Sequence, residues 1–255
     1  MKKHFTKFNC KSFVAKVLSL AVIGLMSVGV STAQLVGGLG YTIDANSPTA
    51  GLNFASFGDF KTALGGGILG AVKVTVASGS GPYSEAVTFT AVSGASATNT
   101  ITIDGNGEKI TTSGNYVINL NGADYFTFDN LVIENTTTSS SYNKCVWIHA
   151  VANNNTIENC ELLMPRHAST SSGSCYIGVF NSESSAQSTG NPGSNNVIDN
   201  NKMSADVRMG PYAGVSVAND GTYNYSLRKL TVTNNDIKNW YYAGIFAYSA
   251  SEVDF

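Results

Sequence analysis

Five aromatic residues stand where they could contact a ligand. They are Trp147, His149, Phe180, Phe246 and Tyr248. Each occupies an outward position of a short segment whose apolar residues alternate with a period of two, so these side chains form two columns. Aromatic faces pack on the apolar faces of sugar rings, and the columns predict a carbohydrate-binding strip. The alternative is a loop that folds back over the rings, because exposed aromatic strips are uncommon on monomers.

The same two columns argue against catalysis on this face. Their other members are neutral: Asn119, Asn121, Gly178, Ser216 and Ala218. A polysaccharide lyase needs a base to remove a proton beside a uronate carboxylate, and a hydrolase needs paired carboxylates. Outside the columns, Arg166, His167 and Arg208 are isolated candidates for a base, and His149 has no carboxylate beside it in its column.

Three carboxylates form a further column. Asp129, Glu158 and Asp199 share the third position of a repeated segment. At a strand spacing of about 4.8 Å they repel one another unless they are solvated or bridged by a cation. A calcium site and a solvated acidic face are therefore both open interpretations, and no other cofactor is implied.

An internal repeat supplies the elements that position these residues. Four segments align without gaps: 127–133, 156–162, 197–203 and 231–237. The second and seventh positions are always apolar, and the fourth is always asparagine: Asn130, Asn159, Asn200 and Asn234. Asparagine tolerates the backbone angles of a tight corner and can bond the turns above and below it. We expect these four residues to form a structural ladder rather than to contact a ligand.

A second series of short strands alternates with the first. Its members are 118–120, 146–148, 177–179, 215–217 and 245–247, with steps of 28, 31, 38 and 30 residues between equivalent positions. No single turn can bury its own apolar face, so stability must come from stacked neighbours. The pattern predicts an all-β solenoid in which each turn carries about three short parallel strands.

The asparagine column, the alternating strands and the turn length resemble the pectin-lyase-like superfamily of right-handed parallel β-helices, from about Val72 onward. Segment 54–64 has apolar residues at helical spacing and looks like the short helix that caps the start of such coils. Segments 72–76 and 81–89 look like the first turn. The resemblance implies that Glu85, in a Tyr-x-Glu-x-Val sequence there, is structural.

A closer resemblance is to large secreted or surface β-helix repeat proteins of Gram-negative bacteria that use C-terminal sorting. Segments 94–103 and 120–129 carry it. Ile245–Tyr248 begins a turn and the sequence closes at Phe255 without a cap. Because an uncapped coil exposes unpaired backbone groups, we expect a longer protein of which this chain is the N-terminal part.

The first 33 residues have the pattern of a signal peptide. Five lysines and no acid precede an apolar run over 17–30, and Ser31-Thr32-Ala33 supplies small residues before a cleavage site at Gln34. The run is too short for a comfortable membrane span, so no transmembrane segment is expected after cleavage. The expected organisation is a signal peptide over 1–33, an N-terminal segment with the capping helix over 34–70, and the β-helix over 71–255.

Charge and cysteine content fit an exported protein. Five of the 15 Lys and Arg residues lie in the leader, which leaves 10 against 17 Asp and Glu, a net charge of −7. Nothing basic is clustered, which argues against binding to nucleic acid. Cys145, Cys160 and Cys175 remain after cleavage. They suit either one disulfide with one free thiol or small residues packed in the strands.

These observations favour a secreted or cell-surface β-helix that binds carbohydrate or acts as an adhesin, with a polysaccharide or cell-surface glycan as its partner. A polysaccharide lyase or glycoside hydrolase is the second interpretation, and a structural stalk is the third. The sequence leaves the oligomeric state open.

Overall fold

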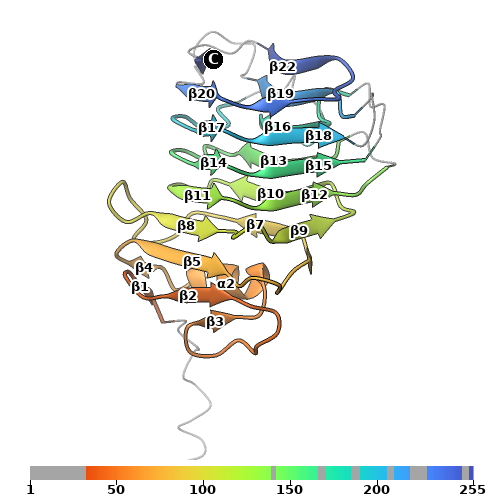
Figure 1. Ribbon diagram of the computed structural model, residues 1–255. Coiled ribbons are helices and arrows are strands. Elements are labelled where there is room, and N and C mark those ends of the chain that lie inside the picture. The colour runs from red at the N-terminus through yellow and green to blue at the C-terminus, as the bar shows by residue number, and fades with distance from the viewer. Residues whose placement is uncertain are drawn as a thin grey trace, which may run out of the picture. The chain divides into compact units, whose positions relative to one another are not determined.

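The chain winds into a right-handed parallel β-helix with three strands in each turn (Figure 1). The computed structural model describes residues 33–138, 142–165, 171–184, 190–205, 210–218, 229–248 and 253–254. All of them belong to one compact unit, Ala33–Phe255. Arg166, His167 and Arg208, together with the expected signal peptide up to Thr32, lie outside the described residues.

Three parallel sheets run along the coil, and we number them I to III. Sheet I contains β7 (Val87–Phe89), β10 (Tyr116–Asn121), β13 (Lys144–His149), β16 (Cys175–Val179), β19 (Ala213–Ala218) and β22 (Ala243–Tyr248). Sheet II contains β3 (Asn53–Phe54), β2 (Tyr41–Ile43), β5 (Val72–Val76), β8 (Ile101–Asp104), β11 (Phe126–Asp129), β14 (Thr156–Glu158), β17 (Val197–Asp199), β20 (Leu230–Thr233) and β23 (Val253–Asp254). Sheet III contains β6 (Tyr83–Ser84), β9 (Lys109–Thr112), β12 (Val132–Asn135), β15 (Glu161–Met164), β18 (Lys202–Ala205) and β21 (Asp236–Ile237). A short pair, β1 (Leu35–Val36) with β4 (Ile68–Leu69), lies beside the first turns.

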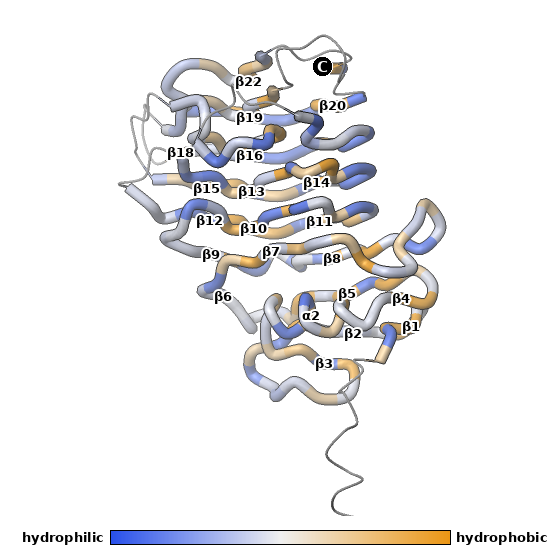
Figure 2. The backbone as a smooth tube through the Cα atoms, turned by 180° about the vertical axis from the view of Figure 1, so that it is seen from behind, coloured by the Kyte–Doolittle hydropathy of each residue, from blue (hydrophilic) through white to orange (hydrophobic). Residues whose placement is uncertain are grey.

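The core consists of apolar columns that point into the coil. Ile118, Val146, Ile177 and Val215 follow one another in register on sheet I and are all fully buried. Phe128, Ile157 and Ile198 form the matching column on sheet II. Orange, apolar segments recur from turn to turn along the tube in Figure 2. The period of two predicted from the sequence thus places alternate residues inside.

The corner between sheets II and III explains the invariant asparagine. The φ angles of Asn130, Asn159, Asn200 and Asn234 are 54°, 54°, 52° and 55°. Asparagine adopts this left-handed conformation more readily than most residues. At these four corners the chain therefore bends without a glycine after three or four strand residues. The short corner keeps successive turns in register.

The buried amide ladders are formed by other asparagines. Asn155 and Asn196 are buried on the approach to sheet II, where the Asn155 Nδ2 donates to Asn196 Oδ1 over 3.1 Å. Asn201 Nδ2 donates to Asn235 Oδ1 over 3.0 Å, one residue after the corner asparagines. These amides bond backbone groups of adjacent turns, whereas the four corner side chains are exposed.

A helix caps the start of the coil, as the sequence predicts. Helix α2 (Phe57–Leu64) begins after Ser56, whose side chain accepts a hydrogen bond from Asp59 N over 3.0 Å. The carboxylate of Glu85 accepts from the amides of Phe57 and Gly58, each over 2.9 Å. Glu85 therefore satisfies two free N–H groups at the helix N-terminus, which is a structural role.

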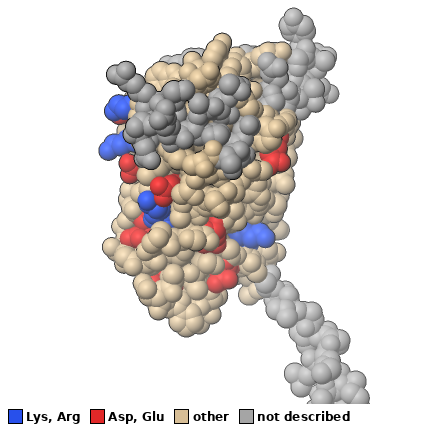
Figure 3. All heavy atoms as spheres, turned by 90° about the vertical axis from the view of Figure 1, so that its right-hand side faces the viewer, with Lys and Arg blue, Asp and Glu red and all other residues tan. Residues whose placement is uncertain are grey.

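Charged side chains are few on the face of the molecule shown in Figure 3, and the two signs are mixed there. Within the described residues there are three ion pairs, for example Lys73 with Asp104 at 2.9 Å. None of the helices described is long and apolar enough to cross a membrane.

Candidate functional site

Two of the five aromatic residues predicted to bind a ligand are buried. Trp147 is 7% exposed and Phe180 is fully buried, so neither ring face is open to solvent. Trp147 stacks on His149, with ring centroids 3.8 Å apart and an interplanar angle of 12°. Of the two interpretations of the aromatic columns, a covered face describes this part of sheet I.

The segment Phe180–Ser184, which follows β16, supplies part of the cover, and we call it the strap. Trp147 Nε1 donates to the carbonyl oxygen of Phe180 over 2.7 Å. Asn181 Oδ1 accepts from Ala150 N over 2.9 Å, and Glu183 Oε1 accepts from Asn115 Nδ2 over 2.6 Å. The strap is therefore bonded to Trp147 on β13, to Ala150 after that strand, and to Asn115 just before β10.

A buried lysine under the strap was not predicted from the sequence. Lys144 is fully buried, and its Nζ donates to the carbonyl oxygens of Tyr142 over 2.6 Å and Glu183 over 3.0 Å. The same Nζ lies 4.9 Å from the ring centroid of Trp147 and 5.6 Å from that of Phe180. Burial lowers the pKa of Lys144 to about 8. Lys144 thus adds an amine to the outer face of sheet I, where the two columns read from the sequence contain no lysine or arginine.

The alternation of the strand breaks just after this lysine. Cys145 and Val146 are consecutive and both are fully buried in the main core. A strict period of two, counted back from the outward Trp147, would have placed Lys144 inside. The side chain of Lys144 lies on the outer face instead. The same pair of consecutive core residues recurs on β10, as Val117 and Ile118, and on β16, as Tyr176 and Ile177.

His149 is also held in its neutral form. Its Nε2 lies 2.8 Å from Asn119 Oδ1. Burial, followed by the nearby charge of Lys144, lowers the pKa of His149 to about 4. The described surroundings pair this ring with an amide and an indole rather than a carboxylate, so the arrangement lacks the base and orienting acid of a hydrolytic site.

Exposed aromatic side chains gather on the turn that contains β22. Phe246 is half-buried and Tyr248 is 40% exposed, so this end of the aromatic columns is partly open to solvent. Tyr242, 63% exposed, stacks on Tyr212 with centroids 4.8 Å apart, and Tyr212 meets Phe246 edge to face at 5.3 Å. Trp240 and Tyr241 beside them are also exposed. We call these residues the aromatic surface: Tyr212, Trp240, Tyr241, Tyr242, Phe246 and Tyr248.

The sequence contained a signal for the unpredicted part of the aromatic surface. Trp240, Tyr241 and Tyr242 are consecutive and lie between β21 and β22. They fall outside both periodic series of strands, so a search along the columns passes over them. Three adjacent large aromatics in a connection between strands are themselves unusual, because such connections favour small polar residues.

The acidic column exists, and its two aspartates, Asp129 and Asp199, accept hydrogen bonds from protein donors. Asp129 and Asp199 flank Glu158 in register on sheet II. Asn159 donates to Asp129 Oδ1 over 2.7 Å, and hydrogen bonds from Thr233 and Asn234 lower the pKa of Asp199. Burial, then Asp129 and Asp199, raise the pKa of Glu158. No group of three or more His, Cys, Asp or Glu in the described parts of the chain could hold a metal ion. The calcium interpretation therefore gains no support.

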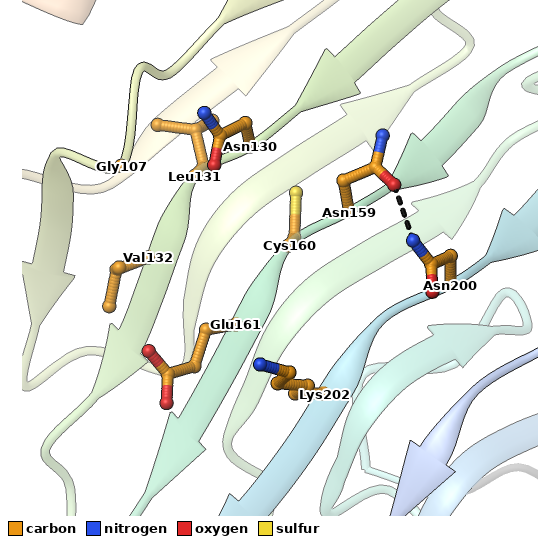
Figure 4. Close-up of a pocket in the computed structure, with 9 residues that line it drawn as sticks. All are labelled: Gly107, Asn130, Leu131, Val132, Asn159, Cys160, Glu161, Asn200 and Lys202. Atoms are coloured by element: carbon orange, nitrogen blue, oxygen red, sulfur yellow. Dashed lines mark hydrogen bonds between the residues drawn. The ribbon is translucent and has the colours of Figure 1, made fainter.

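Three of the four corner asparagines, Asn130, Asn159 and Asn200, line a groove on the outside of the coil (Figure 4). Asn200 Nδ2 donates to Asn159 Oδ1 over 2.7 Å, so two members of the expected ladder are joined. Glu161 and Lys202 form the other side of the groove, which has a volume of about 430 Å³. Its amides and opposite charges make it a polar, open surface, unlike the enclosed apolar pockets that hold most small ligands.

The three cysteines are free and buried. Cys175 pairs in register with Lys144, not with Cys145. Cys145 belongs to the main core, whereas Cys175 packs with Phe180 on the outer side of sheet I. Burial raises the pKa of all three thiols, to about 12 for Cys160 and about 11 for Cys175. Of the two interpretations, small residues packed in the strands describes them.

Comparison with known proteins adds no relative: no family model, no curated protein and no solved structure matches this chain.

Proposed function

We propose that this chain is a secreted or cell-surface β-helix of the pectin-lyase-like type that binds carbohydrate, or adheres to a glycan-bearing surface, through its aromatic surface. The exposed rings around β22 carry the proposal. Tyr242, Phe246 and Tyr248 succeed one another along one side of this strand, with 6.0 Å between the centroids of the first two. Sugar rings stack on such faces, and clustered exposed aromatics commonly mark binding surfaces.

Charge and the leader support the same proposal. The signal-peptide pattern directs the chain out of the cytoplasm, and the remaining net charge of −7 disfavours anionic partners such as nucleic acid. Trp240 and Tyr242 are followed by a strand without charged side chains, Ala243–Tyr248. A neutral or weakly charged glycan therefore fits this surface better than a polyuronate.

Lys144 gives the enzyme alternative its one specific observation. An amine with a pKa of about 8 on the outer face of a sheet is a suitable base for a lyase. Its Nζ, however, is enclosed and donates to two carbonyl oxygens. A lyase or hydrolase predicts unsaturated products or new reducing ends from a polysaccharide, and a structural stalk predicts neither product formation nor retention.

Affinity electrophoresis of the full chain in gels that contain soluble polysaccharides tests the proposal. A retained polysaccharide should slow the chain, and Tyr242→Ala or Tyr248→Ala should weaken binding about fivefold, since one stacked ring contributes about 1 kcal/mol. Tyr142→Ala is the matched control, because Tyr142 is 39% exposed but precedes β13. Retention by none of a broad panel, or equal retention of all three variants, contradicts the proposal.

A further inference from the structure

The strap encloses a cationic side chain that has no counter-ion at contact distance. Within the described residues, no carboxylate lies within ion-pair distance of Lys144 Nζ. The carboxylate of Glu183 on the strap is bonded to Asn115 instead, and only the Glu183 carbonyl oxygen accepts from the lysine. A buried amine without a counter-ion favours its neutral form, because burial penalises the charge.

The titratable groups around this amine come from four elements. Tyr116 on β10 packs against Trp147, with centroids 6.1 Å apart, and His149 follows on β13. Cys175 on β16 is the register partner of Lys144, and Glu183 lies on the strap. Glu183 and Cys175 are the groups that favour the protonated amine, and burial outweighs both. The strap contributes the Glu183 carbonyl oxygen and the Phe180 ring to the enclosure of this amine.

Lifting the strap would remove the Glu183 carbonyl oxygen and the Phe180 ring from around Lys144 Nζ and bring this amine closer to water. The pKa of Lys144 would then rise from about 8 towards its ordinary value of 10.5. Lys144 binds a proton more readily in the open state, so acid favours opening and alkali favours closure. A complete return to 10.5 corresponds to a shift of about 300-fold in the opening equilibrium between pH 10.5 and pH 8.

We propose that the strap Phe180–Ser184 is a pH-dependent cover over Trp147, closed in alkali and released as Lys144 takes up a proton. Release uncovers Trp147 on the outer face of sheet I, the face that also carries Phe246 and Tyr248 on β22. The proposal of a cover depends only on the contacts of the strap itself. Its consequence for ligand binding rests on the proposed function, because the uncovered ring extends the aromatic surface.

The two tryptophans provide a direct assay of the cover. The chain contains only Trp147, which is buried, and Trp240, which is 40% exposed. Trp240→Phe therefore leaves Trp147 as the sole indole reporter. Acrylamide quenching of its fluorescence should increase as the pH is lowered from 9.5 to 5, while far-ultraviolet circular dichroism shows that the coil persists.

Substitutions of the lysine provide matched tests in the Trp240→Phe background. Lys144→Met keeps the length of the side chain without its charge and should abolish the change in quenching above pH 7. Lys144→Arg stays charged at every pH and should leave Trp147 accessible throughout. Quenching of the Trp240→Phe chain that is constant from pH 9.5 to 5 overturns the proposal, whether or not the lysine variants fold. So does a pH dependence in Lys144→Met equal to that of the lysine form.

Glycan retention by the unmodified chain at pH 5.5 and pH 9 separates the cover from its consequence. Stronger retention at pH 5.5, together with greater quenching, supports both. Quenching that follows pH with equal retention at the two pH values supports the cover and overturns its link to binding. A chain that no glycan retains removes the proposed function and leaves the quenching test unaffected.

Discussion

Replacement of Asn155 by leucine should destabilise the coil strongly, because this amide bonds the backbone of a neighbouring turn. Asn155 is fully buried, its Oδ1 accepts from Phe126 N over 3.0 Å, and its Nδ2 donates to Ala123 O over 2.8 Å. Leucine has a similar size and offers neither bond. Two buried backbone groups then lack partners, at about 2 kcal/mol each, so the free energy of unfolding should fall by about 4 kcal/mol.

Asn130→Gly is the matched control for this substitution. Asn130 belongs to the invariant column at the corner, its side chain is exposed and its φ is 54°. Glycine adopts that angle freely, so the free energy of unfolding should change by no more than about 0.5 kcal/mol. Urea denaturation followed by far-ultraviolet circular dichroism measures both variants. Equal losses for the two, or a loss below about 1 kcal/mol for Asn155→Leu, would refute the assignment of the ladder to the buried amides.

Three further substitutions test other contacts. Glu85→Gln replaces a carboxylate that accepts from two amides at the start of α2 by a group with one acceptor oxygen, and should cost about 2 kcal/mol; an unchanged thermal midpoint contradicts the capping role. Asp199→Asn removes one of the charges that raise the pKa of Glu158, so that pKa should fall in an NMR titration, and a constant or higher value would disagree. Gly178→Ala places a methyl group 2.6 Å from the Phe180 ring and should cost about 2 kcal/mol in urea denaturation, whereas a neutral effect would show that the ring moves freely.

The sequence predicts the fold well because stacking imposes the same constraint on every turn. A residue such as Ile157 must be apolar since it lies between Phe128 and Ile198 in the same column. Asn159 recurs because each corner needs the same positive φ. These requirements repeat along the chain, so the period and the position of the corner can be seen without knowledge of any long-range contact.

The site is harder to predict because it depends on what breaks the repeat. Lys144 faces outward because the two residues after it, Cys145 and Val146, both belong to the main core, and the strap lies in the irregular connection that follows β16. Trp147 is buried because residues of that connection contact it, as Phe180 does, and not because of its position on its own strand. Likewise Tyr242 belongs to a link between sheets, where no periodicity applies. Local patterns identify which residues face outward but not which of them a loop then covers.

A crystal structure of the chain with an oligosaccharide from a retained polysaccharide would test the central claim most directly. The proposal predicts a sugar ring stacked on Tyr242, Tyr248 or Trp240, with the oligosaccharide along the outer side of β22. A sugar bound only in the corner groove beside Asn159 and Lys202, with the aromatic surface empty, would contradict it.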